Sequence, residues 1–135
     1  MTRHWKLSIV CCVIFSATAV PGYGQSCKGI PATELVQMPT FCWEECSGKI
    51  YGPEYRIDGQ LCPGSNHYCF ALMHFIRGKK PTGDSKTRLT HLLFAKEQTR
   101  YTLNAIEKSP RCPIRAHVDS TWNEVNARLT GLGQK

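Results

Sequence analysis

The residue types best suited to chemistry in this 135-residue chain are its histidines and cysteines. Two histidines beside a lysine can cleave RNA by general acid–base catalysis, and a basic chain with a net charge of +7 would suit that substrate. The histidines beyond the N-terminal segment are His67, His74, His91 and His117. Their spacing matches no catalytic signature, so structural roles are favoured. A small secreted ribonuclease-like enzyme is kept as a third hypothesis, with His67 and His117 as the residues to test.

The carboxylates do not form a catalytic pair in the sequence. Glu44 and Glu45 are adjacent, so they would point to opposite faces of a strand, or lie about 100° apart on a helix. The chain also lacks a Gly-x-Ser-x-Gly motif, a phosphate-binding loop and a zinc-binding His-Glu signature. We therefore expect a protein that is not an enzyme and that uses no cofactor.

The N-terminus has the pattern of a secretory signal peptide. A basic start precedes residues 7–20, whose polar side chains are only Ser and Thr, and small residues precede Gln25. The apolar run is too short to span a bilayer. We expect residues 1–24 to be removed by cleavage after Gly24, and residues 25–135 to form a single secreted, disulfide-rich domain.

Six cysteines remain after this cleavage, and an even number in a small exported chain predicts disulfides. They are Cys27, Cys42, Cys46, Cys62, Cys69 and Cys112. Their spacing is looser than that of structural zinc sites, and export favours oxidation, so no metal site is expected. We expect Cys27 to pair with Cys112. The alternatives left for the others are a Cys62–Cys69 clip, or a ladder that joins Cys42 and Cys46 to that pair.

The charge of the expected mature chain is modest. Removal of the leader leaves 15 basic and 10 acidic side chains, a net charge of +5, and no run of five or more basic residues occurs. Such a surface is compatible with an acidic glycan or an anionic surface as ligand, and it does not indicate nucleic acid.

The stretch from about Ser85 to Lys108 contains neither Gly nor Pro and predicts one long amphipathic helix. Asp84 or Ser85 can cap its first turn, and Pro110 stops it. A smaller second face carries Phe94, Tyr101 and Ala105, so we expect the helix to contact two different partners. Its broad apolar face consists of Leu89, Leu92, Leu93, Ala95, Leu103 and Ile106.

The remaining elements are expected to be short strands. Asp58-Gly59 predicts a tight hairpin turn between two of them, and the apolar run from Tyr68 to Ile76 predicts a buried strand. Residues 114–118 and 125–130 alternate apolar with polar side chains, which is the period of a strand. Strands with a single helix predict an α+β domain, namely a small antiparallel OB-like barrel whose open side the helix covers.

Aromatic side chains near cationic ones are the better functional clue. Rings stack on the faces of sugars, and cations beside them hold carboxylates, so this combination suits an acidic glycan. Aromatic residues in a small disulfide-rich domain also commonly belong to the core. The candidate glycan-binding residues, chosen on chemistry alone, are Trp43, Lys49, Tyr51, Tyr55, Arg56 and Trp122.

Three segments near the C-terminus carry a resemblance to a known family. They read Thr-Arg-Leu-Thr-His-Leu-Leu-Phe at 87–94, Pro-Ile-Arg-Ala-His-Val at 113–118, and Asn-Ala-Arg-Leu-Thr-Gly-Leu at 126–132. With them, about a third of the mature chain resembles the receptor-binding B subunits of pertussis-like and cholera-like bacterial toxins, which carry one enzymatic A chain on a ring of five B chains.

The resemblance implies an OB barrel in a homo- or hetero-pentamer, with the long helix lining the central pore. It also implies host cell-surface glycans as ligands and an enzymatic toxin A subunit as partner. No sugar-binding motif of the family is matched, so no binding residue is carried over. The residues expected at the oligomer contact or the pore are Phe94, Lys96, Arg100 and Tyr101.

These observations predict a secreted, non-enzymatic subunit that binds glycans and delivers a toxic partner as part of a ring. The alternative is a monomeric, disulfide-rich effector or inhibitor that binds a host protein. The cysteine density fits both hypotheses, and the oligomeric state separates them.

Overall fold

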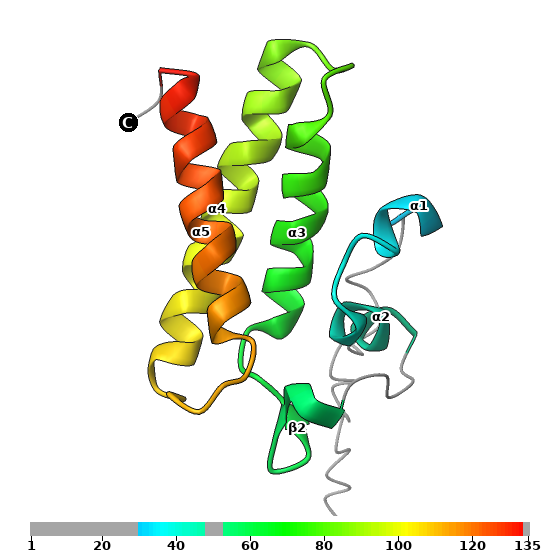
Figure 1. Ribbon diagram of the computed structural model, residues 1–135, viewed down its shortest axis with the longest axis vertical. Helices are drawn as coiled ribbons and strands as arrows, with labels where there is room; N and C mark the ends of the chain where they lie inside the picture. The colour runs from blue at the N-terminus through cyan, green and yellow to red at the C-terminus, as the bar shows by residue number, and fades with distance from the viewer. Residues whose placement is uncertain (1–29, 48–52, 134–135) are drawn as a thin grey trace, which may run out of the picture.

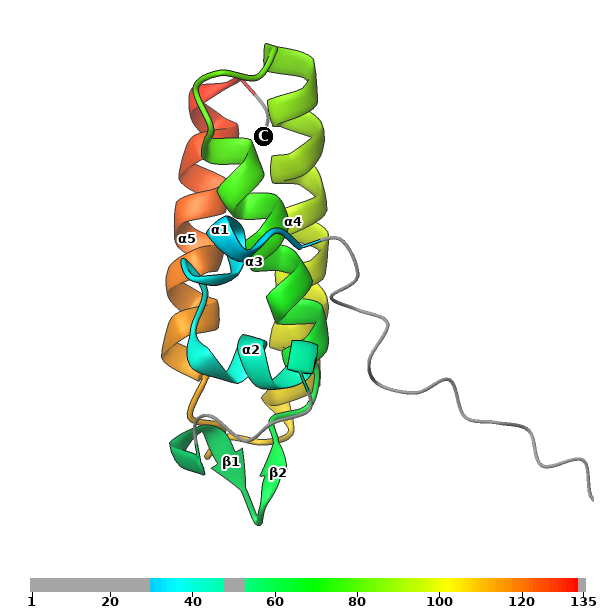
Figure 2. The same ribbon diagram turned by 90° about the vertical axis from the view of Figure 1, so that its right-hand side faces the viewer.

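A bundle of three long helices forms the main body of the protein (Figure 1). The computed structural model describes residues 30–47 and 53–133. The elements are α1 (Ala32–Leu35), α2 (Thr40–Ser47), a 3₁₀ turn η1 (Pro53–Tyr55), β1 (Arg56–Ile57), β2 (Gln60–Leu61), α3 (Ser65–Lys79), α4 (Ser85–Glu107) and α5 (Arg115–Gly131). Helices α3, α4 and α5 run antiparallel in sequence order, and α1 and α2 lie against α3, as Figure 2 shows from the side.

The expected α+β fold with an OB-like barrel is wrong. Within the described residues the strands form one antiparallel hairpin, in which Arg56 pairs with Leu61 and Ile57 with Gln60, and two such short strands cannot close into a barrel. The hairpin itself lies where its turn was predicted. Asp58 and Gly59 have φ values of 50° and 79°, the left-handed conformation that a tight two-residue turn requires.

The C-terminal segments expected to be strands belong to α5. Ile114, Val118 and Val125 are buried, at the spacing of one helical face. Ala116 and Ala127, which a strand would bury with them, are exposed. Positions four residues apart share a face in a helix and also in a strand, so a short alternation fits both. The residue midway between them distinguishes the two structures, because a strand buries it with them and a helix turns it to another side.

The segment from Tyr68 to Ile76 is also helical and forms the middle of α3. Its run of apolar residues is nearly continuous because α3 packs against α1 and α2 on one side and against α4 and α5 on the other. Ala, Leu and Met within the run favour a helix, and only Ile76 is β-branched. A helix buried on several sides and a buried strand therefore have the same apolar pattern, and the length of the run did not separate them.

The long helix predicted from about Ser85 to Lys108 is present as α4. Asp84 caps it, since its carboxylate accepts hydrogen bonds from the backbone N–H of Thr87 at 2.9 Å and from the Thr87 hydroxyl at 2.6 Å. Leu92, Ala95 and Ile106 are buried as expected for the broad apolar face. Leu93, assigned to the same face, is 42% exposed and was misplaced.

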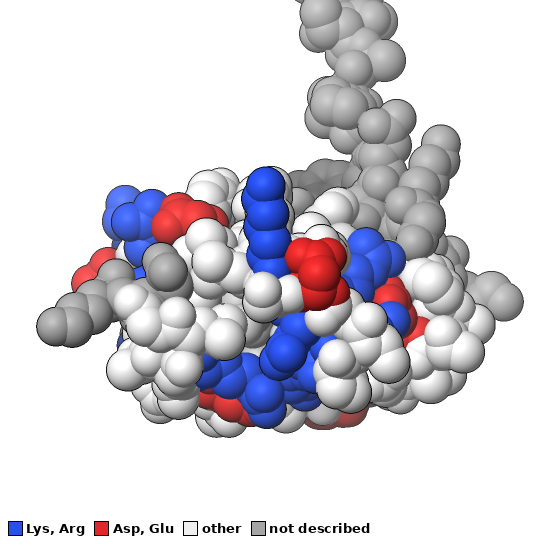
Figure 3. Space-filling view, turned by 90° about the horizontal axis from the view of Figure 1, so that it is seen from above, with Lys and Arg blue, Asp and Glu red and all other residues white. Residues whose placement is uncertain are grey.

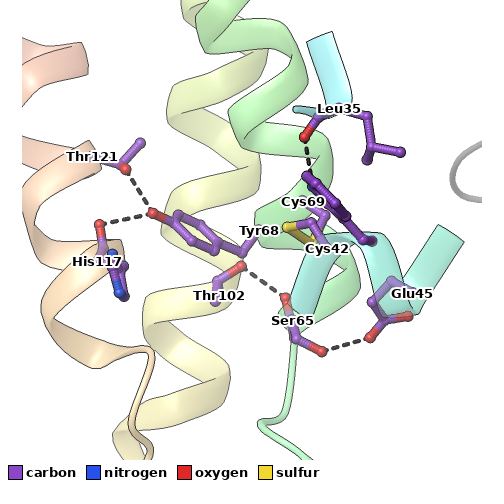
Figure 4. Close-up of a disulfide and its surroundings, with 11 residues drawn as sticks. Leu35, Cys42, Glu45, Ser65, Tyr68, Cys69, Thr102, His117 and Thr121 are labelled. Atoms are coloured by element: carbon purple, nitrogen blue, oxygen red, sulfur yellow. Dashed lines mark hydrogen bonds between the residues drawn. A yellow bond between two sulfur atoms is a disulfide. The ribbon is translucent and has the colours of Figure 1, made fainter. Parts of the chain in front are cut away.

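Tyr68 joins α3 to α5 inside the larger of two apolar clusters (Figure 4). Its hydroxyl donates to the His117 carbonyl oxygen at 2.8 Å and lies 2.8 Å from Thr121 Oγ1. Burial raises the pKa of Tyr68 to about 12, so the phenol stays a neutral donor. The smaller cluster fills the other end of the bundle and contains Phe75, Leu92, Ala95, Val125 and Leu129.

Two disulfides connect the smaller elements to the bundle. Cys42 of α2 bonds to Cys69 of α3, and Cys62 bonds to Cys112 between α4 and α5. The second bond rules out both the expected Cys27–Cys112 pair and the Cys62–Cys69 clip. The Cys42–Cys69 bond is one of those predicted by the alternative in which Cys42 and Cys46 join Cys62 and Cys69.

Several predictions concern residues outside the described ranges. The expected signal peptide, Cys27, Lys49 and Tyr51 lie there, and the side chain of Cys46 is likewise not described. None of the helices in residues 30–47 and 53–133 has the length and apolar character needed to cross a membrane.

Helices α3 and α4 are in close contact at a glycine. A Cβ atom placed on Gly78 would lie 2.8 Å and 2.9 Å from side-chain carbons of Leu92, which is itself fully buried. Gly131, the last residue of α5, has open space around the same position. A Gly131→Ala variant is therefore a suitable control for a Gly78→Ala variant.

The first prediction concerns this contact. Replacement of Gly78 by Ala should lower the free energy of unfolding by about 1–3 kcal/mol, because the added methyl group must displace Leu92 in a packed core. Gly131→Ala should leave stability unchanged or raise it by about 0.4–1 kcal/mol, through the unfolded state. Urea unfolding followed by circular dichroism measures both, and equal effects at the two positions would contradict the close approach.

The second prediction concerns the covalent links. Peptide mapping of the unreduced protein should recover the Cys42–Cys69 and Cys62–Cys112 pairs. The Cys62→Ala/Cys112→Ala variant should lose about 4 kcal/mol of stability, because this bond closes a sequence separation of 50 residues. The Cys42→Ala/Cys69→Ala variant should lose slightly less, about 3.5 kcal/mol, for a separation of 27 residues. A different pairing in the peptide map would overturn the arrangement of α2 on α3.

Candidate functional site

The exposed apolar side chains of the described residues gather on α4. Leu93, Phe94 and Tyr101 are 42%, 52% and 54% exposed, and the two other large exposed hydrophobic residues, Val36 and Leu132, directly follow α1 and α5. The opposite face of α4 is buried in the bundle. Helix α4 therefore has a second apolar face that no described part of the chain covers.

Two imidazole–aromatic pairs lie along the line where α3 meets α4. The His67 ring packs on the Tyr101 ring with centroids 3.9 Å apart, and the His74 ring stacks on Phe94 with centroids 4.8 Å apart. Both histidines come from α3 and both aromatic residues from α4, and each set is separated by seven residues. Because the helices are antiparallel, the two pairs repeat about 10 Å apart along the bundle. We call His67, His74, His91, Phe94 and Tyr101 the α3–α4 stripe.

A small cleft adjoins the His67–Tyr101 pair of the stripe. Its volume is about 210 Å³, below the 300–1,000 Å³ of typical small-molecule sites. Gln98 Oε1 accepts from His67 Nδ1 at 2.7 Å, which fixes the orientation of this imidazole. Arg100 pairs with Glu97 at 2.6 Å on the outer edge. The lining residues are His67, Glu97, Gln98, Arg100, Tyr101 and Asn104.

The His74–Phe94 pair of the stripe contacts a second histidine, His91. His74 Nδ1 and His91 Nδ1 are 2.9 Å apart, so one ring donates a proton and the other must accept it. The pKa of His74 is lowered, first by burial and then by the positive charges of His91 and Arg77, while Glu34 opposes the shift. If both imidazoles were protonated, neither Nδ1 could accept, so the hydrogen bond would be lost and two cations would lie side by side.

The predicted glycan-binding residues have described contacts within the fold. Trp43 donates from its indole nitrogen to the Leu35 carbonyl oxygen at 2.7 Å, and Tyr55 packs on Phe41 with ring centroids 4.9 Å apart. Arg56 forms an ion pair with buried Glu44.

Trp122 is half-buried on α5, and none of the contacts in the described ranges joins it to these three residues. The glycan assignment stays a prediction, and the described part of the chain gives it no assembled surface.

The residues predicted at an oligomer contact or pore divide into two groups. Phe94 and Tyr101 belong to the stripe, whereas Lys96 is half-buried and Arg100 pairs with Glu97. The barrel that would hold α4 beside a central pore is not formed by the described residues. The pore assignment has therefore lost its structural basis, and the expectation of self-association stays a prediction.

The two histidines proposed for acid–base chemistry have different surroundings. His67 packs on Tyr101 of α4, whereas His117 lies on α5 beside the Tyr55 ring, with centroids 6.1 Å apart. No described contact brings them together. Within the same ranges, no three potential metal-ligating side chains of His, Cys, Asp or Glu gather at one place.

Comparisons with protein-family models, with curated proteins and with solved structures found no match for this chain. The candidate site is therefore identified from the geometry of the chain itself.

The sequence prediction named the histidines of the stripe but missed their pairing with aromatic residues, because it placed His67 in a turn and His74 in a strand over residues 68–76. In a strand, His67 and His74 point to opposite faces, since they are separated by an odd number of residues. In a helix, seven residues return the side chain to nearly the same face. The matching interval between Phe94 and Tyr101 on the next helix was the signal that would have revealed the pairs.

The third prediction follows from the lowered pKa of His74. The unfolded chain binds a proton at this residue near pH 6.5, whereas the folded protein binds it only at lower pH. The contribution of His74 to stability is therefore fully present above pH 6.5 and is lost as the pH falls towards the folded-state pKa. Urea unfolding should show lower stability at about pH 5 than at about pH 7.5.

His74→Gln should reduce this dependence on pH, because the amide does not titrate in that range. His117→Gln, at an exposed position on α5, is the control and should retain the dependence. A wild-type slope in His74→Gln would show that the His74 environment does not cause it.

Proposed function

We propose that this chain is an exported, non-catalytic protein that binds one helix of a partner protein along the α3–α4 stripe. One observation carries the proposal: Phe94 and Tyr101 are each about half exposed, and each packs on an imidazole of the neighbouring helix. Half-exposed aromatic rings held in place by neighbours supply apolar contact area at little further cost in entropy.

The spacing of the stripe favours a helix as the bound element. The two aromatic residues are separated by seven positions, about 10 Å along α4. A partner helix laid along the α3–α4 line presents apolar side chains at the same interval, one at every second turn. The small cleft beside His67 can receive one such side chain, whereas its volume is low for a separate small-molecule site.

The polar edge of the stripe is suited to a specific contact. Glu97 and Arg100 form an exposed pair beside Tyr101, and Gln98, which bonds to His67, lines the same cleft. Apolar centres surrounded by polar side chains are typical of protein interfaces. We therefore prefer the hypothesis of a disulfide-rich effector or inhibitor that binds another protein to that of a toxin ring, because the described residues do not form the barrel expected of such a ring.

Export is supported by the disulfides. Cys42–Cys69 and Cys62–Cys112 belong to the core cluster, and such bonds persist mainly in oxidising compartments. They also hold the bundle rigid, so the stripe needs little rearrangement on binding.

The fourth prediction tests the stripe. A photo-crosslinking residue placed at position 93, next to Phe94, should capture a protein from extracellular fluid, and that protein is then made recombinantly for calorimetric titration. Phe94→Ala/Tyr101→Ala should weaken its binding by about tenfold or more, because two interface aromatics are truncated. Val36→Ala is the matched control, since Val36, directly after α1, is 64% exposed, and it should change the affinity less than about twofold.

Sedimentation analysis tells the alternatives apart. If Phe94→Ala/Tyr101→Ala converts a wild-type oligomer into a monomer, the second face of α4 binds another copy of this chain and the proposed partner is wrong. Equal losses in the stripe and Val36 variants would also overturn the proposal. Unchanged circular dichroism is required of each variant and is expected, because the replaced side chains are exposed.

A further inference from the structure

One end of the bundle collects positive charge from three helices. The end of α3, the start of α4 and the end of α5 meet there, and Figure 3 looks down on it. Lys and Arg side chains spread across this view, with a continuous group along its lower edge. Its basic residues are Arg77, Lys79, Lys80, Lys86, Arg88 and Arg128, and its acidic residues are Glu34, Asp84 and Glu124. We call this surface the basic end.

The three acidic side chains of the basic end are already engaged. Glu34 is buried and accepts from Arg77 at 2.9 Å and from Lys80 at 2.7 Å. Glu124 pairs with Arg128 at 3.0 Å, and Asp84 caps α4. The cations exceed the anions, so a positive charge remains at this surface.

Lys79 and Arg128 are held against the same aromatic ring, and Arg128 is also the partner of Glu124. Lys79 Nζ lies 4.4 Å from the centre of the Phe75 ring, and the guanidinium carbon of Arg128, on another helix, lies 5.8 Å from the same centre. Arg88 donates to the Gly78 carbonyl oxygen at 3.4 Å. Lys79 and Lys86 form no ion pair with any described residue. Cations from different helices are thus fixed close together.

Among the described residues, the opposite end of the bundle carries no such excess of cations. Lys108, Arg111 and Arg115 lie there, between α4 and α5, and Arg115 pairs with Asp119 at 3.1 Å. Glu107 and the acidic residues of the hairpin region, Glu54 and Asp58, balance the other charges. Among the described residues, the excess of cations therefore lies at the basic end and not at the opposite end.

We infer that the basic end binds a sulfated glycan chain. Several Lys and Arg groups on three helices match a ligand that carries repeated oxyanions, and both residue types donate charge-assisted hydrogen bonds to such groups. The inference goes beyond the proposed function because it uses none of the stripe residues. It assigns the chain a second ligand, which would retain an exported protein near cell surfaces or matrix while the stripe binds its partner.

A glycan fits this surface better than an anionic membrane. Membrane insertion adds exposed apolar side chains to the cations. Of the large exposed hydrophobic residues in the described ranges, only Leu132 and Val36, which follow α5 and α1, lie next to elements that reach this surface, and they come from different helices. Binding to an anionic membrane is therefore the alternative that the experiment below tests.

The fifth prediction uses the oxidised mature protein and a heparin oligosaccharide as probe, at about 0.15 M salt, where exposed charges more than about 8 Å apart are largely screened. The Lys79→Gln/Lys86→Gln/Arg88→Gln variant should bind this probe at least about tenfold more weakly than the wild type. The Lys108→Gln/Arg111→Gln/Arg115→Gln variant removes the same charge from the opposite end and should lose less than about twofold. The affinity of the wild type should fall steeply with added salt.

Three results would overturn the inference. Equal losses in the two triple variants would show attraction to net charge alone, and failure of the wild type to bind heparin at this salt would remove the site. Tighter binding to vesicles with anionic lipid than to heparin, lost in the same variant, would assign the surface to membranes. Phe94→Ala/Tyr101→Ala should bind heparin like the wild type, which keeps failure of this inference distinct from failure of the proposed function. Thermal unfolding of both triple variants confirms that they fold.

Discussion

The attachment of α3 on two sides is the constraint on which the described structure depends. On one side the Cys42–Cys69 bond fixes α2, and on the other the buried Tyr68 hydroxyl reaches the His117 carbonyl oxygen on α5. A disulfide limits the unfolded chain, and a satisfied buried hydroxyl avoids the cost of an unpaired donor. With α3 fixed, α4 can pack on it closely, as the glycine at position 78 allows. The faces of the bundle that α1 and α2 reach are thereby covered, and the α3–α4 stripe is left open.

Covering one side of a three-helix bundle and leaving another open gives the two surfaces different properties. The covered side contains a buried carboxylate, Glu34, that binds Arg77 and Lys80 and ties α1 to the end of α3. The open side contains rings that are half exposed and imidazoles whose Nδ1 atoms bond to Gln98 or to one another. The stripe is thus ordered before any ligand arrives, which lowers the entropic cost of binding. Because neighbouring helices are antiparallel, the end of α3, the start of α4 and the end of α5 meet at one end of the bundle. Their Lys and Arg side chains gather there.

Part of this fold was accessible from sequence because the signals were local. The α4 helix followed from its period, its Asp84 cap and its freedom from Gly and Pro, and the hairpin followed from Asp58-Gly59. The second apolar face with Phe94 and Tyr101 was visible in the same way. The OB-like barrel was wrong because residues 114–118 and 125–130 have too few positions to separate a period of 2 from one of 3.6. A resemblance carried by those same short segments could not supply the missing information.

By itself, the sequence determined the even cysteine number, the long helix with two faces and the tight turn, since each depends on residues close together in the chain. Tertiary structure alone decided which cysteines pair, because pairing depends on which Cα atoms come within bonding distance after folding. It also decided that His67 meets Tyr101 and His74 meets Phe94, contacts that require two antiparallel helices in one register. The charge of the basic end is collected from three helices, and such a surface exists only when their ends are brought to one place.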